Sequence, residues 1–171
     1  MRLARGGSAP VRWLGHRTLH CGAYARPELV WPVRVRAGAF GPGLPRRDLL
    51  LSPDHAVFVS VDGYGDALVP VRHLVDGVGI RQEEVALVAY WHVELDAHEV
   101  ILAEGMPAES YLDTGNRSAF ANGGPAVALL SAFVQQRWEE RACAQLVVAG
   151  PIVDAVRRQN RGRSLVAQIQ H

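Results

Sequence analysis

The chain has 171 residues, of which 49% are hydrophobic and 20% are charged. This length and balance are typical of one globular domain and exclude an intrinsically disordered chain. The formal net charge of +1 gives no bulk electrostatic reason for nucleic-acid binding, so we expect no nucleic-acid partner.

Two cysteines, Cys21 and Cys143, stand too far apart in the sequence for a CxxC pair or a zinc-type spacing. We therefore expect free thiols, no bound metal and no cofactor. The sequence has no apolar run of the roughly 20 residues that a membrane span needs. The start, MRLARGGS, lacks the apolar core of a signal peptide. By default these features indicate a cytoplasmic protein, or one exported as part of a longer polypeptide.

Short apolar segments separated by turn residues predict a β-rich body. Valine alternates with arginine from Val33 to Arg36, which is the pattern of a half-buried strand. Asp62-Gly63 predicts a hairpin between two further apolar segments. We predict strand-like segments at residues 10–15, 29–37, 56–61 and 67–75, and a loop over the glycines and prolines of residues 38–48.

Residues 83–105 are long, apolar and rich in β-branched and aromatic side chains. We predict two antiparallel strands here, joined at the break formed by Asp96-Ala97-His98. A helix is the rival for residues 83–95. A strand is favoured because apolar residues fall on every second position, as in the pattern of one face of a strand: Val85, Leu87, Ala89, Trp91, Val93 and Leu95.

The character of the chain changes after residue 111. Residues 111–127 are rich in asparagine and glycine and predict a loop. Residues 151–170 predict a helix, because Pro151 suits a first turn and Ile152, Ala155 and Val156 share one face. The whole pattern predicts an all-β body with a helical tail.

Ser52-Pro53-Asp54-His55 forms a corner before the segment 56–61. A histidine at a strand entrance can polarise a peptide carbonyl or protonate a departing amide nitrogen, and Ser52 could place a hydroxyl beside the same peptide. An ordinary turn explains the same residues, because serine, proline and aspartate all favour turns.

Three further groups invite a chemical interpretation. Asp96 could hold the imidazole of His98, although an Asx turn with a solvated histidine explains both residues equally. His92, Glu94 and His98 could hold a metal, but no tight ligand spacing supports this. Glu109-Ser110 could belong to a serine hydrolase, but no GxSxG motif is present.

Four segments together, and in this order, resemble the bacterial Hint domains of the Hedgehog/intein superfamily: residues 10–17, 26–59, 70–77 and 90–117. The resemblance implies a Hint fold, an all-β horseshoe of intertwined hairpins with pseudo-twofold symmetry. We therefore expect a loop-like start at residues 1–9, a Hint domain incomplete at its N-terminus over residues 10–125, and a partly helical C-terminal extension over residues 126–171.

The resemblance also implies a self-cleavage reaction. In the family, a cysteine or serine at the first position of the domain attacks the preceding carbonyl, and the amide becomes a thioester or ester. A histidine in a T-x-x-H-like block assists, and Ser52 to His55 match that block with serine in place of threonine. His98 falls on a second histidine position of the family. The implied substrate is the upstream segment of the same polypeptide.

The sequence departs from the family pattern in three places. The cysteine-rich start expected upstream of residues 10–17 is not matched, and Cys21 lies after that segment. Glu109-Ser110 stands where inteins close on His-Asn, which argues against splicing. Trp91 stands nearest to an aspartate found in some members, with Asp96 as a substitute. We therefore expect a truncated copy inactive by itself, or alternatively a nucleophile-less β scaffold that acts as a binding or interaction module.

Overall fold

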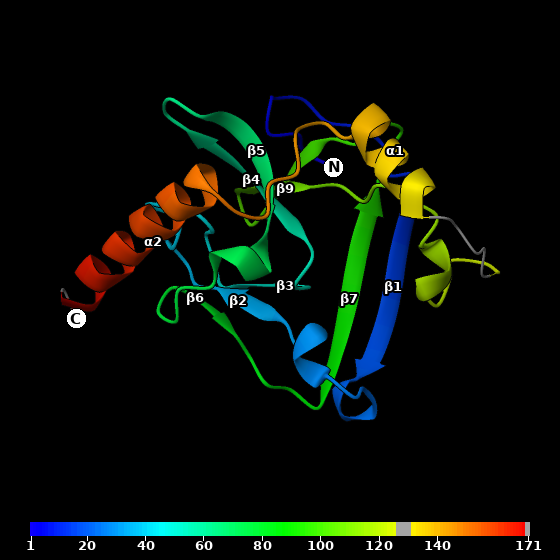
Figure 1. Cartoon of the computed structure of the whole chain (residues 1–171), viewed down its shortest axis with the longest axis horizontal. Helices are drawn as coiled ribbons and strands as arrows, with labels where there is room; N and C mark the ends of the chain where they lie inside the picture. The colour runs from blue at the N-terminus through cyan, green and yellow to red at the C-terminus, as the bar shows by residue number, and fades with distance from the viewer. Residues whose placement is uncertain (126–130, 170–171) are drawn as a thin grey trace.

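The computed structural model describes residues 1–125 and 131–169 and shows a mostly β body with helices near its C-terminal end (Figure 1). The strands are β1 (Trp13–His20), β2 (Val33–Val35), β3 (Leu49–Leu51), β4 (Ala56–Val61), β5 (Gly65–Pro70), β6 (Ile80–Gln82), β7 (Leu87–Glu94), β8 (Val100–Ala103) and β9 (Met106–Glu109). The helices are α1 (Ser131–Arg141) and α2 (Pro151–Ile169). The prediction of an all-β body with a helical tail is confirmed.

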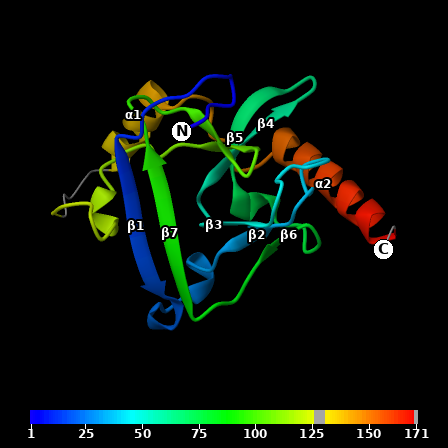
Figure 2. The ribbon, with the colours of Figure 1, turned by 180° about the vertical axis from the view of Figure 1, so that it is seen from behind.

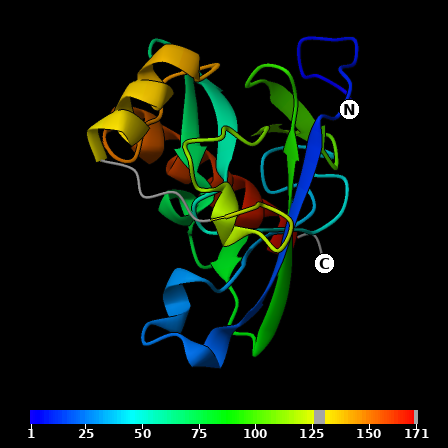
Figure 3. The same ribbon diagram turned by 90° about the vertical axis from the view of Figure 1, so that its right-hand side faces the viewer.

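The strands form three antiparallel sheets in the orders β1-β7, β3-β2-β6 and β5-β4-β9-β8. The β1-β7 ribbon and α2 lie at opposite ends of the molecule (Figure 2). In the side view, the ribbon and α1 lie on opposite sides (Figure 3). The hairpin predicted at Asp62-Gly63 is confirmed, since β4 and β5 pair around it and Gly63 has a positive φ of 79°.

The pairing predicted within residues 83–105 is wrong. β7 pairs along its whole length with β1, from Trp13 opposite Glu94 to His20 opposite Leu87. β8 instead pairs with β9 through a tight turn at Glu104-Gly105, where both residues have positive φ. The chain therefore passes from one sheet to another between Glu94 and Val100. β1 matches β7 at 8 residues and β9 matches β8 at 4 residues, so β7 and β8 each pair with another strand and the break between them is a crossover and not a hairpin.

The face of β7 that carries the alternating apolar residues points to solvent over much of the strand. Leu87 is 53% exposed and Trp91 is 60% exposed, whereas Tyr90 on the opposite face is buried. The tyrosine hydroxyl donates a hydrogen bond of 2.7 Å to the carbonyl oxygen of Val30. The alternation identified the strand correctly, but aromatic and histidine side chains occupy its inner face.

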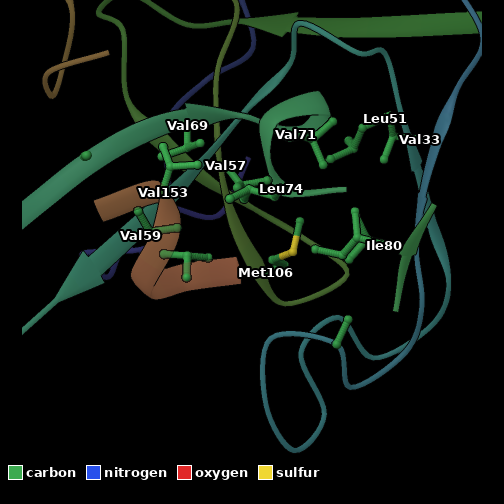
Figure 4. Packing of buried hydrophobic residues seen from close by; sticks show 14 of the residues in the cluster. Val33, Leu51, Val57, Val59, Val69, Val71, Leu74, Ile80, Met106 and Val153 are labelled. Atoms are coloured by element: carbon green, nitrogen blue, oxygen red, sulfur yellow. The ribbon is translucent and has the colours of Figure 1, made fainter. Parts of the chain in front are cut away.

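The main core lies between the four-stranded sheet, the three-stranded sheet and α2. Val153 of α2 lies among Val57, Val59 and Val69 of β4 and β5 (Figure 4). Val153 and Val156 are both almost completely buried. The C-terminal helix therefore shares one hydrophobic core with the β body.

Two irregular segments add backbone hydrogen bonds to sheet edges. Residues 2–4 lie along β8, where Ala4 N–H donates to Val100 and Leu102 N–H donates to Arg2. Residues 145–147 lie along β5, held by hydrogen bonds to both the N–H and the carbonyl of Leu68. The predicted loop at 111–127 carries a short 3-10 turn at Arg117–Ala119, and its residues 126–127 lie outside the described part, as does residue 170 of the predicted helix. Neither described helix is long and apolar enough to cross a membrane.

Burial of α2 generates a stability prediction. We expect Val153→Asp to lower the free energy of unfolding by roughly 3 kcal/mol, because an unpaired carboxylate enters an apolar core. Val148→Asp is the matched control, because Val148 is 51% exposed and should tolerate the charge. Urea unfolding followed by circular dichroism measures both. Equal stabilities of the two variants would show that α2 does not share the core.

Candidate active site around His98

The site is built around the carboxylate of Glu109, the last residue of β9. Its Oε1 accepts a hydrogen bond of 2.7 Å from the N–H of Ala56, the first residue of β4. Its Oε2 lies 3.5 Å from Nε2 of His98, and the glutamate side chain is 11% exposed. A buried carboxylate requires such partners, so Glu109 connects the start of β4 to the loop that carries His98.

His98 lies completely inside the protein, with a side-chain exposure of 0%. Trp138 of α1 packs edge-on against its ring at a centroid distance of 5.6 Å. Its Nδ1 accepts a hydrogen bond of 3.1 Å from the backbone N–H of Cys143. An accepting Nδ1 carries no proton, so the neutral ring has its proton on Nε2, facing Glu109.

The surroundings of His98 favour its charged form. Burial acts to lower the pKa of His98, but hydrogen bonding and charge from Cys143 and Glu109 outweigh it and raise that pKa to about 9. Protonation of Nδ1 requires the Cys143 amide to give up its hydrogen bond. The charge of His98 and the position of the Cys143 peptide are therefore coupled.

His55, which lies beside Glu109, pairs with His92 at a distance of 5.4 Å between their ring centroids. Burial lowers the pKa of His55, partly opposed by Glu109, and the charge of His98 lowers it further. Burial also lowers the pKa of His92, together with His55 and Arg17, to about 3. At neutral pH both rings are therefore neutral while His98 is charged, and neutral imidazoles can accept or donate a proton.

Aromatic side chains surround the inner face of His92. Tyr111 and Phe120 each meet its ring edge-on, and Trp13 packs against both of them. A cavity of about 310 Å³ opens beside His98 and is lined also by Tyr111, Asp113 and Arg141. The site is thus a partly enclosed space between the β1-β7 ribbon and α1.

The corner at Ser52 and His55 is both a turn and part of the site. The N–H of His55 donates to the carbonyl oxygen of Ser52 at 3.0 Å, as the turn interpretation requires. The same turn places His55 beside Glu109, and Ser52 is 7% exposed. The two interpretations offered by the sequence are therefore compatible.

Asp96 lies apart from this cluster of residues. Its side chain is 62% exposed and makes a two-pronged ion pair with Arg12. The neighbour of His98 is instead Glu109, eleven positions further along the chain. The structure brings together His55 and His98, and it places the Asp96 carboxylate on Arg12.

The residues considered in the sequence for a metal site and for a serine hydrolase site make other contacts in the structure. Glu94 forms an ion pair with Arg117, while His92 faces the aromatic side chains. Within residues 1–125 and 131–169, no group of three or more histidine, cysteine or acidic side chains is arranged to hold a metal ion. Ser110 is completely buried, and its hydroxyl accepts a hydrogen bond of 2.9 Å from the N–H of Glu99.

Sequence reasoning missed two members of the site. Glu109 was considered only beside Ser110, although an acidic residue at the end of a buried strand such as Met106–Glu109 is a signal for a paired carboxylate. Cys143 follows α1 and reaches His98 across 45 positions of sequence. No local pattern indicates that contact.

A protein-family model described as Hint domain matches residues 2–115 of the chain. The chain belongs to the Hint domain family. The resemblance found in the sequence is thereby confirmed, and the matched residues include His55, His98 and Glu109 but stop before Cys143. No curated protein and no solved structure shows significant similarity to the chain.

The lowered pKa of His92 predicts acid destabilisation. The unfolded chain binds a proton at this side chain near pH 6.5, whereas the folded protein resists it until about pH 3. The folded state therefore loses stability as the pH falls from 6.5 towards 3. We expect His92→Phe to remove part of this loss, because phenylalanine keeps the aromatic contacts and does not titrate.

Thermal melts of both proteins between pH 7.5 and 4 measure this difference. The exposed His20 supplies the control variant His20→Gln, whose melting temperature should follow that of the unmodified protein. A pH dependence of His92→Phe identical to that of the unmodified protein would contradict the assignment.

The contact between Glu109 and His98 predicts a change in titration. We expect Glu109→Gln to lower the pKa of His98 from about 9, because the neighbouring negative charge is lost. NMR titration of the histidine ring protons measures it. Asp96→Asn is the matched control, since Asp96 is only two positions from His98 but pairs with Arg12. A shift in the control, with none in Glu109→Gln, would make Asp96 the partner of His98.

Proposed function

We propose that this Hint domain is an autoprocessing domain that breaks a peptide bond of its own polypeptide by an acyl shift from nitrogen to sulfur or oxygen. The observation that carries the proposal is the hydrogen bond of a peptide N–H to Nδ1 of a buried histidine whose other nitrogen faces a carboxylate. This arrangement places a buried imidazole within hydrogen-bond distance of an amide nitrogen, and once Nδ1 carries a proton the ring can protonate such a nitrogen as it leaves.

The roles of the side chains follow from their surroundings. An amide nitrogen is a poor leaving group until it is protonated, and the raised pKa of His98 keeps a proton available near neutral pH. Glu109 stabilises the charged ring and fixes its orientation, as a carboxylate does beside other catalytic histidines. His55, neutral because of burial, is the second acid–base group, and the Ser52 turn positions it.

The upstream segment of the same polypeptide is the proposed substrate. Residues 2–4 run along β8, whose first residue, Val100, lies two positions after His98. The polypeptide that enters the domain is thus held beside the strand that follows His98. An acyl shift moves one acyl group between atoms of the same chain, so it requires no cofactor.

A binding module is the competing function, and one feature favours it. The outward face of the β1-β7 ribbon exposes Leu14, Leu87 and Trp91, of which Trp91 is 60% exposed. Exposed apolar side chains on one sheet face are found at protein interaction sites. A binding module needs no acid–base group, so its function would survive the loss of His98.

The test uses the protein expressed from its native reading frame, together with any polypeptide encoded ahead of residue 1. Hydroxylamine cleaves thioesters and esters, so we expect it to release an N-terminal fragment that mass spectrometry detects. His98→Gln should slow this release by about 100-fold or more, because general acid–base catalysis contributes at least that much.

His20→Gln should release the fragment at the unmodified rate, because His20 is exposed and far from the site. His98→Gln must be shown to be folded by circular dichroism. Should it unfold, Glu109→Gln provides the second variant. The absence of any fragment from the unmodified protein, or equal rates in all variants, would overturn the proposal.

A further inference from the structure

The peptide group that is hydrogen-bonded to His98 belongs to this same chain and lies after the residues that match the Hint domain. The N–H of Cys143 donates to Nδ1 of His98 at 3.1 Å, while the family match ends at residue 115. The nitrogen of the Ala142–Cys143 peptide bond is thus hydrogen-bonded directly to the imidazole of His98. This contact gives the site a specific peptide bond on which it can act.

This peptide bond is held on both sides. Before it, the N–H of Ala142 donates to the carbonyl oxygen of Trp138 at 3.0 Å, and Trp138 packs on the ring of His98. After it, Gln145 and Val147 each make a hydrogen bond of 2.8 Å with Leu68 of β5. A bond fixed at both ends against a catalytic group has already lost much of the entropy that a reaction would otherwise cost.

Cys143 also carries the nucleophile that this bond needs. Its backbone N–H binds Nδ1 of His98, so the thiol on the same residue lies beside the imidazole, and the side chain is only partly buried. Cys21, the other cysteine, is 1% exposed and contacts the carbonyl of Leu19. A cysteine thiol can reach the carbonyl carbon of the residue before it through a five-membered ring, so no movement of a distant group is required.

We propose that the Ala142–Cys143 peptide bond is a scissile bond of this site, with Cys143 as the nucleophile and His98 as the group that moves the proton. The proposal rests on the autoprocessing function above, because it uses the same His98 and Glu109. It adds a cleavage point at the C-terminal side of the Hint domain, distinct from the upstream segment.

The proposed step balances without a further reactant. The neutral form of His98, which becomes populated as the pH approaches its pKa of about 9, takes the proton of the Cys143 thiol on Nδ1, and Sγ forms a bond to the carbonyl carbon of Ala142. The charged ring, stabilised by Glu109, then gives this proton to the Cys143 nitrogen as the carbon–nitrogen bond breaks. The products are a thioester between Ala142 and Sγ and a free amine on Cys143. Water or another nucleophile then cleaves the thioester.

Cleavage would leave residues 143–171 bound to the body. Val153 and Val156 are buried in the main core, and residues 145–147 remain hydrogen-bonded to β5. The two pieces therefore separate only when the protein is denatured. The reaction gives the second piece a new N-terminal cysteine, which can react with a thioester of another chain.

The test incubates the full 171-residue chain with hydroxylamine at pH 9, close to the pKa of His98, and records intact masses under denaturing conditions. We expect a fragment of residues 143–171 with an N-terminal cysteine, and a fragment of residues 1–142 that ends in a hydroxamate. Cys143→Ala should abolish both fragments. His98→Gln should slow their formation by about 100-fold or more.

Cys21→Ala is the matched control and should cleave at the unmodified rate, because Cys21 lies outside this site. Circular dichroism verifies that Cys143→Ala is folded, and Cys143→Ser, which should give a slower hydroxylamine-sensitive shift, supplies a second variant. Absence of the 143–171 fragment from the unmodified chain would overturn this inference.

The two proposals fail in distinguishable ways. An upstream fragment that depends on His98, without the 143–171 fragment, would leave the autoprocessing function standing and refute cleavage at Cys143. The reverse result would support cleavage at Cys143 and refute the upstream substrate. Cleavage at Cys143 that persists at full rate in His98→Gln would refute the role of the histidine in this step.

Discussion

The arrangement of the site depends on the buried carboxylate of Glu109. One of its oxygens is fixed by the N–H of Ala56, and the other faces His98. A carboxylate in an apolar interior is stable only with hydrogen-bond donors or positive charge around it. The start of β4 supplies the donor and His98 supplies the charge. The strand pairing of β4 with β9 therefore positions the carboxylate that faces His98.

The change of sheet after β7 brings His98 to this carboxylate. β7 belongs to the ribbon with β1, whereas β8 belongs to the sheet with β9. His98 lies in the crossover between β7 and β8. Its ring contacts Glu109 on β9, and it also contacts Trp138 and Cys143, which lie after the residues that match the Hint domain. The residues from α1 onward consequently contact the candidate site and also contribute to the core.

Local patterns in the sequence predicted the elements better than their partners. Alternation and turn chemistry were sufficient for β4, β5 and their hairpin at Asp62-Gly63, because these depend on neighbouring residues. The pairing of β7 with β1 connects residues more than 60 positions apart, and no local pattern encodes such a choice. The inward face of β7 carries Tyr90 and His92, so the alternation of apolar side chains identifies the strand but not the face that is buried.

The same limit applies to the site. His55 and His98 were found because the sequence resembles a family with histidines at those positions. Asp96 was the natural partner of His98 by proximity in sequence, yet Arg12 pairs with it at the surface. Glu109 and Cys143 reach His98 only through the folded arrangement of β9 and of the segment after α1. Tertiary contacts, and not spacing, determine which carboxylate and which peptide meet the histidine.

The most direct measurement of the central claim is the protonation pattern of His98 in the unmodified protein, followed by nitrogen-15 NMR of its ring through a pH titration. We predict that the ring loses its proton from Nδ1 near pH 9 and that the neutral ring keeps the proton on Nε2, facing Glu109. The backbone carbon resonances of Cys143 should shift with the same midpoint, because its amide takes the vacated Nδ1. A neutral ring with its proton on Nδ1, or a Cys143 peptide that does not respond, would contradict the account.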